Sequence, residues 1–172
     1  RPCDSIETAE CWAIALDDKL VPSGMVLSRQ KVPTLRTEHT NENRSARGAY
    51  ILAEAEGGNR KATILATGSE VSIAIAARQA LQKEGIPTAV VSMPCWELFD
   101  AQDKKYRQAV LGPGSIRVAV EAGIRQGWDK YIRPHGGFVG MTGFGASAPA
   151  EVLFEHFGIN AEKTVKSVKE RL

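Results

Sequence analysis

The feature that most constrains the fold is a set of short apolar runs that do not alternate with polar residues. They lie at 62–66 (ATILA), 88–93 (TAVVSM) and 117–121 (RVAVE). Strands of this kind are buried on both faces, whereas alternating strands leave one face in water. Helical segments separate the runs along the chain. The pattern therefore predicts an α/β fold with three layers, in which a mostly parallel sheet carries helices on both faces.

The segment between the first two runs has the signals of a helix. Thr67 and Glu70 are spaced as a capping box, in which side chains accept hydrogen bonds from free backbone amides. Gly85, with Pro87 just beyond it, marks the predicted end. The apolar positions between these signals are Ile73, Ala74, Ala77 and Leu81. Further strands are predicted at 48–54, as an edge strand, and at 137–141, and further helices at 100–110, 128–132, 149–158 and 161–172.

The first 30 residues form a separate unit. Asp4 and Glu7 are spaced as a second capping box, and the helix that follows ends before 22–24. Its predicted apolar face consists of Ile6, Ala9, Ala13 and Leu16. A short apolar run at 25–27 predicts a buried strand. This helix and strand are too small to fold alone, so residues 1–30 are interpreted as the end of a preceding domain.

The polar stretch 31–48 has no periodicity and predicts an interdomain linker. Residues 49–172 would then form one α/β domain of ordinary size. The chain begins with Arg1 rather than Met, so we expect it to be part of a longer protein.

Composition excludes several classes of protein. The 22 basic and 20 acidic residues are interspersed, which argues against a nucleic-acid partner. Apolar runs stay well below the ~20 residues of a membrane span, and the start lacks a signal-peptide pattern. The three cysteines lack a C-x-x-C motif, so reduced thiols in a cytoplasmic protein fit best. For Cys95, a buried structural thiol is favoured over a reactive one.

Three features are candidates for chemistry. The strand–helix junction at Thr67–Glu70 could bind an anion, but Glu70 would repel it, and a plain helix cap is favoured. The glycine-rich segment 140–147 precedes a helix without the spacing of a dinucleotide fingerprint. Turns and close packing explain its glycines best, and a regulatory ligand there stays open. The histidines at 39, 135 and 156 are scattered and predict no metal site.

Arg29 follows the predicted strand at 25–27, between Ser28 and Gln30. A guanidinium group can hold a phosphate through two parallel charge-assisted hydrogen bonds. From the residues alone, a surface or ion-paired arginine is the default interpretation.

Seven segments, taken in order and spacing, resemble transketolases. They are residues 1–12 (RPCDSIETAECW), 27–30 (LSRQ) with Pro33, 48–50 (GAY), 66–71 (ATGSEV), 91–99 (VSMPCWELF), 121–128 (EAGIRQGW) and 143–149 (GFGASAP). Each segment alone is modest, but together they cover nearly the whole chain. The chain is similar to the end of the pyrimidine-binding domain followed by the C-terminal domain of that family.

The resemblance implies a transferase that moves a two-carbon ketol unit between phosphorylated sugars in the pentose phosphate pathway. Such enzymes use thiamine diphosphate with a divalent metal, Mg or Ca, and act as homodimers. The arginine of the family's Ser-Arg-Gln segment contacts the sugar phosphate, which implies that role for Arg29, with Ser28 adjacent.

The family's catalytic glutamate, metal ligands and diphosphate-binding loop have no counterpart here. We therefore expect the chain alone to bind no cofactor or metal, to be inactive, and to serve phosphate contact, scaffolding and dimer assembly. Two alternatives stay open. One is the same region of a deoxyxylulose-phosphate synthase or a 2-oxoacid dehydrogenase E1 component, and the other is a stand-alone α/β binding or assembly module.

Overall fold

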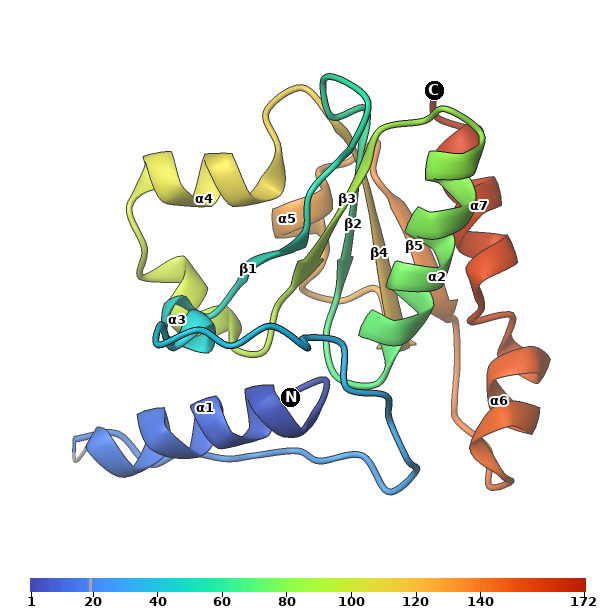
Figure 1. Cartoon of the computed structure of the whole chain (residues 1–172). Coiled ribbons are helices and arrows are strands. Elements are labelled where there is room, and N and C mark those ends of the chain that lie inside the picture. The colour runs from blue at the N-terminus through green and yellow to red at the C-terminus, as the bar shows by residue number, and fades with distance from the viewer. Residues whose placement is uncertain (19) are drawn as a thin grey trace.

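A five-stranded sheet forms the centre of the computed structural model, which describes residues 1–18 and 20–172 (Figure 1). Its strands are β1 (Tyr50–Ala53), β2 (Ala62–Ala66), β3 (Thr88–Ser92), β4 (Ile116–Ile124) and β5 (Gly137–Met141), in the order β1-β3-β2-β4-β5. β2 pairs in parallel with β3 and β4, and β4 pairs in parallel with β5. Only β1 is antiparallel, at the edge beside β3. This confirms the predicted, mostly parallel sheet and its edge strand.

Helices cover both faces of the sheet (Figure 1). One face carries α2 (Glu70–Lys83) and α7 (Ala161–Lys169), and the other carries α3 (Trp96–Asp100), α4 (Lys104–Leu111) and α5 (Asp129–Ile132), while α6 (Ala150–Phe157) precedes α7. Successive residues of β2 face opposite layers: Ile64 packs in the core beneath α2, and Leu65 packs in the core beneath α3 and α4. Because both residues are fully buried, the predicted three-layer arrangement is confirmed.

Helix α2 has the predicted apolar face but not the predicted cap. Ala74, Ala77 and Leu81 are fully buried. The N-cap residue is Ser69, whose side chain makes no capping bond. Its hydroxyl instead donates to Glu70 Oε1 at 2.6 Å. The capping-box prediction was wrong because the carboxylate of Glu70 has a stronger partner, a guanidinium group.

Helix α1 (Ser5–Asp17) begins as predicted, with Asp4 accepting a hydrogen bond from the Glu7 amide at 2.9 Å. Its predicted apolar face, however, is not buried: Ile6 is 41% and Leu16 is 71% exposed. The fully buried residue of the helix is Glu7. The α/β domain presents hydroxyl groups to this helix, so the acidic side turns inward.

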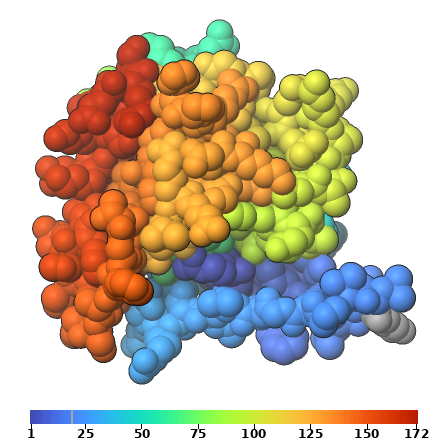
Figure 2. Space-filling view, turned by 180° about the vertical axis from the view of Figure 1, so that it is seen from behind, coloured from blue at the N-terminus to red at the C-terminus, as the bar shows by residue number. Residues whose placement is uncertain are grey.

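The predicted strand at 25–27 was also wrong. The chain there is extended but pairs with no strand among the described residues, and Val26 and Leu27 are 64% and 51% exposed. A strand needs the backbone groups of a neighbour, and the described part of the chain supplies none beside it. The following stretch is irregular up to the short 3₁₀ helix η1 (Arg44–Arg47). We call the described residues before the α/β domain, 1–18 and 20–48, the N-terminal segment. Figure 2 shows this segment as a band along one side of the α/β domain.

Candidate functional site

The carboxyl ends of β2 and β4 form the candidate ligand site that the order of the strands indicates. β3 lies on one side of β2 and β4 on the other, so the connections that leave these strands diverge. Open α/β sheets bind ligands in the crevice that forms at such a point. Thr67–Glu70 follows β2 there, and Glu121 lies near the end of β4.

Arg1 occupies this crevice. Its guanidinium group pairs with Glu70 Oε2 at 3.0 Å and also with Glu121. Its carbonyl accepts hydrogen bonds from the Gly68 amide and the Thr67 hydroxyl, both at 3.1 Å. The junction at Thr67–Glu70 therefore holds a cation and two carboxylates, and it does not fit an anion.

A second polar contact lies beside the first. Glu7 Oε1 accepts hydrogen bonds from the hydroxyls of Tyr50 at 2.7 Å and Ser92 at 2.5 Å, and Oε2 accepts one from the Cys3 amide at 2.7 Å. Burial, followed by the charge of Glu7, raises the pKa of both Tyr50 and Cys3. The carboxylate thus joins α1 to β1 and β3 through neutral donors.

Glu10 makes the third contact. It accepts hydrogen bonds from the Ser45 hydroxyl at 2.7 Å and pairs with Arg36 at 2.9 Å. Burial alone would raise the pKa of Glu10, but the bonds from Arg36 and Ser45 outweigh it, so the pKa is lowered. Glu10 therefore joins α1 to the stretch before β1, whereas Glu7 joins α1 to the sheet.

The sequence patterns do not indicate these roles of Arg1 and Glu121, and they indicate Glu7 only as part of a helix cap. A usable signal exists for Glu121, because this carboxylate ends an otherwise apolar strand, RVAVE. A charge in such a position needs a partner when buried.

The structure places Arg29 and Ser28 apart from these contacts. Both are exposed, and Arg29 begins a bend just after the extended stretch at 25–27. Within the described residues, Arg29 takes part in no ion pair. It is a surface arginine in this chain, with its guanidinium group accessible to a ligand.

The glycine-rich segment follows β5 and is exposed from 142 to 149, with Phe144 fully exposed. A Cβ atom at Gly140 would lie 2.4 Å from the ring of Phe138, so close packing requires this glycine. Gly143 and Gly145 have open space around them. Residues 1–18 and 20–172 contain no group of three or more potential metal ligands, and no helix among them could cross a membrane.

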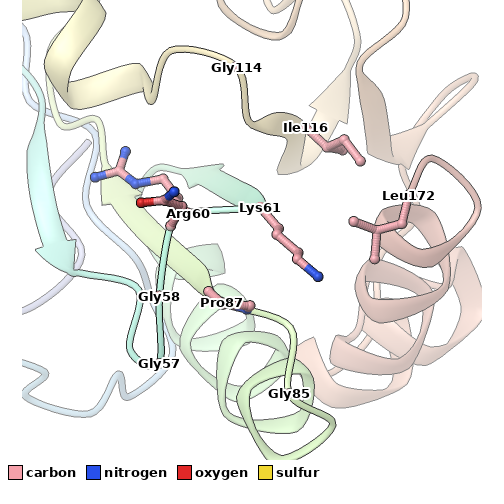
Figure 3. Close-up of a pocket in the computed structure, with 10 residues that line it drawn as sticks. Gly57, Gly58, Arg60, Lys61, Gly85, Pro87, Gly114, Ile116 and Leu172 are labelled. Atoms are coloured by element: carbon pink, nitrogen blue, oxygen red, sulfur yellow. The ribbon is translucent and has the colours of Figure 1, made fainter.

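A pocket lies at the amino ends of the strands, where the turns before β2, β3 and β4 meet (Figure 3). Its volume is about 450 Å³. Lys61 extends into the open space, whereas Arg60 turns away to pair with Glu54. The remaining lining is mostly glycine backbone and apolar side chains, so few polar groups converge on a ligand.

The family model of the "Transketolase-like TK C-terminal domain" matches residues 48–160. The chain belongs to the transketolase family. A transketolase of Sinorhizobium medicae is 60% identical over 173 residues, which cover 100% of this chain and 25% of that relative.

Solved transketolases confirm the fold. The enzyme of Leishmania mexicana superimposes with a TM-score of 0.87 at 44% identity, covering 99% of this chain and 24% of that one. The enzyme of Pichia stipitis, described in complex with sedoheptulose-7-phosphate, gives 0.88 at 32% identity and covers 99% and 24%. The chain therefore spans about a quarter of the length of these transketolases, as their C-terminal portion.

Proposed function

We propose that this chain serves a transketolase that transfers a two-carbon ketol unit between phosphorylated sugars in the pentose phosphate pathway. The observation that carries the proposal is the 60% identity to a transketolase across the whole chain. Deoxyxylulose-phosphate synthases and 2-oxoacid dehydrogenases have less support, because the family model and the relatives described above are transketolases.

Within that enzyme, Arg29 would contact the phosphate group of the sugar. Its exposed guanidinium group supports this role, because two N–H groups can bind two phosphate oxygens in parallel. Ser28 precedes it and would offer a hydroxyl beside the same phosphate. The relative from Pichia stipitis that was crystallised with sedoheptulose-7-phosphate supports a phosphorylated sugar as the ligand.

The side chains of residues 1–18 and 20–172 do not fit thiamine diphosphate or its metal. The described residues hold no group of three potential metal ligands, and Arg1 fills the crevice at the carboxyl ends of β2 and β4. The cofactor and a divalent Mg or Ca ion would bind parts of the enzyme beyond this chain, which would be inactive alone.

Residues 1–30 would be the end of the preceding domain, 31–48 would be a linker, and 49–172 would form the C-terminal domain. Support comes from the large apolar side chains that residues 1–30 expose, because such exposed apolar surface is typical of a region that contacts another part of a protein. These exposed side chains are Ile6, Trp12, Leu16, Leu20, Val21, Val26 and Leu27. The domain would then act as a scaffold within a cytoplasmic homodimer.

The test compares the chain with the complete enzyme. Each is supplied with thiamine diphosphate, Mg²⁺ or Ca²⁺, a ketose phosphate donor and an aldose phosphate acceptor, and product formation is followed by chromatography. We expect ketol transfer by the complete enzyme and none by the 172-residue chain. Turnover by the chain alone would contradict the proposal that the cofactor and its metal bind parts of the enzyme beyond this chain. A complete enzyme that used 2-oxoacids in place of ketose phosphates would contradict the proposed reaction.

A further inference from the structure

A small cavity of about 150 Å³ lies on the face of the sheet that α4 and α5 cover. We call it the basic pocket because five basic side chains line it. They are Lys104, Arg107, Arg117, Lys130 and Arg133. The single carboxylate in the lining belongs to Asp100, so the balance of formal charges is five minus one, or +4. A concentration of like charge in one small cavity costs free energy unless an anion offsets it.

Arg117 is a buried member of this group of basic side chains. It is 6% exposed and extends from the amino half of β4. Its Nη1 donates to the Tyr131 carbonyl at 2.8 Å and its Nη2 to the Gly112 carbonyl at 3.3 Å. Both partners are neutral, and the buried Nε has no partner in the described part of the chain. A buried cation without a carboxylate is rare in proteins.

The surroundings of Arg117 are unfavourable to its charge. Burial, followed by the charges of Arg133 and Arg60, lowers its pKa to about 10. The guanidinium group therefore remains a cation at neutral pH, although its surroundings oppose the charge.

The other members of the basic pocket do not cancel this charge. Asp100 pairs with Lys130 and accepts a hydrogen bond from the Tyr131 hydroxyl at 3.1 Å. Arg107 has a second buried Nε without a partner among the described residues. Two N–H groups of arginine side chains thus remain unsatisfied around one small cavity. Unsatisfied buried donors are expected to have a ligand or water as partner.

We propose that the basic pocket binds a phosphate group, with Arg117 and Arg107 as its principal donors. The volume is below the ~300 Å³ at which pockets enclose drug-sized ligands, so it suits a group of a few atoms. Inorganic phosphate and the phosphate end of a sugar share this chemistry. The site is independent of Arg29, which lies on the N-terminal segment, and of the proposed reaction.

Calorimetric titration with inorganic phosphate tests the proposal in the complete enzyme. An Arg29→Ala background keeps binding at that residue out of the measurement. The diagnostic variant is Lys104→Gln/Arg107→Gln, which removes two charges from the pocket without touching buried Arg117. Its control is Lys105→Gln/Lys163→Gln, which removes two exposed charges outside the lining.

We expect saturable binding that weakens by about tenfold or more in the diagnostic variant, the loss associated with a charge-assisted hydrogen bond. The control should change affinity by less than about twofold, because exposed charges at a distance are screened. No saturable binding, or an equal loss in both variants, would overturn the proposal.

Further titrations distinguish the two sources of phosphate. An aldose phosphate that binds more tightly than inorganic phosphate would identify a phosphorylated sugar as the ligand, and the reverse order would identify the free ion. Both orders require that the corresponding unphosphorylated sugar does not bind. A crystal soaked in selenate adds a direct readout, since the expected anomalous peak lies inside the basic pocket, among the five basic side chains that line it. A peak only elsewhere would contradict the assignment.

Discussion

The hydroxyl of Tyr50 donates a 2.7 Å hydrogen bond to Glu7, and this bond joins α1 to the edge strand of the sheet. The carboxylate also accepts hydrogen bonds from Ser92 and Cys3, so three neutral donors surround it. Arg36 stands over the ring of Tyr50, 5.3 Å from its centre. Helix α1 is therefore attached to the sheet through a polar contact in which both carboxylate oxygens of Glu7 are hydrogen-bonded.

Replacement of Glu7 tests this attachment. In Glu7→Gln, one carboxylate oxygen becomes an amide NH₂ group that faces hydrogen-bond donors. We expect a loss of about 1–3 kcal/mol in the free energy of unfolding, the cost of unsatisfied buried groups. Urea denaturation of the chain measures it, with exposed Glu38→Gln as the control. Equal midpoints for the two variants would show that the network contributes nothing.

Arg1→Ala should loosen the N-terminal segment from the carboxyl edge of the sheet. Glu70 is fully buried and would lose its ion pair, whereas Arg1 is one-third exposed, which moderates the cost. We expect about 1–3 kcal/mol, below the usual cost of breaking a fully buried pair. Hydrogen exchange should show faster exchange in α1. If the loss persists in a Glu70→Gln/Glu121→Gln background, the ion pairs are not its cause.

Stability should fall as the solution becomes alkaline. Burial, followed by the charge of Glu7, raises the pKa of Cys11 from 9.0 to about 11, and burial also raises that of Cys3 and Tyr50. The folded chain holds these protons more tightly than the unfolded chain. The contribution of Cys11 is therefore full below pH 9 and is lost as the pH rises toward 11, and the contributions of Cys3 and Tyr50 are lost over a range that extends to higher pH. Thermal unfolding between these values measures the slope, which Cys11→Ala should reduce.

Gly48→Ala should destabilise the chain more than Gly85→Ala. Both glycines have positive φ, +78° and +74°. A Cβ atom at Gly48 would lie 2.2 Å from the Cys95 carbonyl oxygen, whereas Gly85 has open space. Both variants carry backbone strain, but only Gly48→Ala adds a clash of about 1–3 kcal/mol. A comparison of their denaturation midpoints isolates the clash.

Arg29→Ala in the complete enzyme should raise the Michaelis constant for phosphorylated substrates. The loss of charge-assisted bonds corresponds to about 1–3 kcal/mol of binding. The control is Lys105→Ala, which removes an exposed positive charge that lies outside the basic pocket. Steady-state kinetics with a phosphorylated acceptor and its unphosphorylated counterpart measures the effect. An unchanged constant for the phosphorylated acceptor would remove Arg29 from the substrate site.

The sequence predicts the α/β domain well because its main signals are local. The apolar run of β2 and the helical spacing of Ala74, Ala77 and Leu81 are both present in the structure. Such patterns depend on burial against whatever lies next to them, and the adjacent layers are supplied by the same domain.

Local patterns do not predict the burial of residues 1–30 correctly, because the residues that contact this segment are distant in sequence. Ile6 and Leu16 have helical spacing but face outward, since Tyr50 and Ser92 offer hydroxyls to the opposite side of α1. The strand expected at 25–27 lacks a neighbour among the described residues. At the candidate site, the resemblance singled out Arg29, whereas the roles of Arg1 and Arg117 depend on contacts that no local pattern reveals.

The buried bonds of Glu7 and Arg1 indicate that a stable domain must begin before residue 48, the first residue that the family model matches. That model starts at residue 48, but a protein cut there would leave the hydroxyls of Tyr50 and Ser92 without their acceptor. It would also uncover the carboxylate of Glu70. Anyone who isolates this domain should therefore retain α1, because its buried carboxylate is hydrogen-bonded to side chains of β1 and β3.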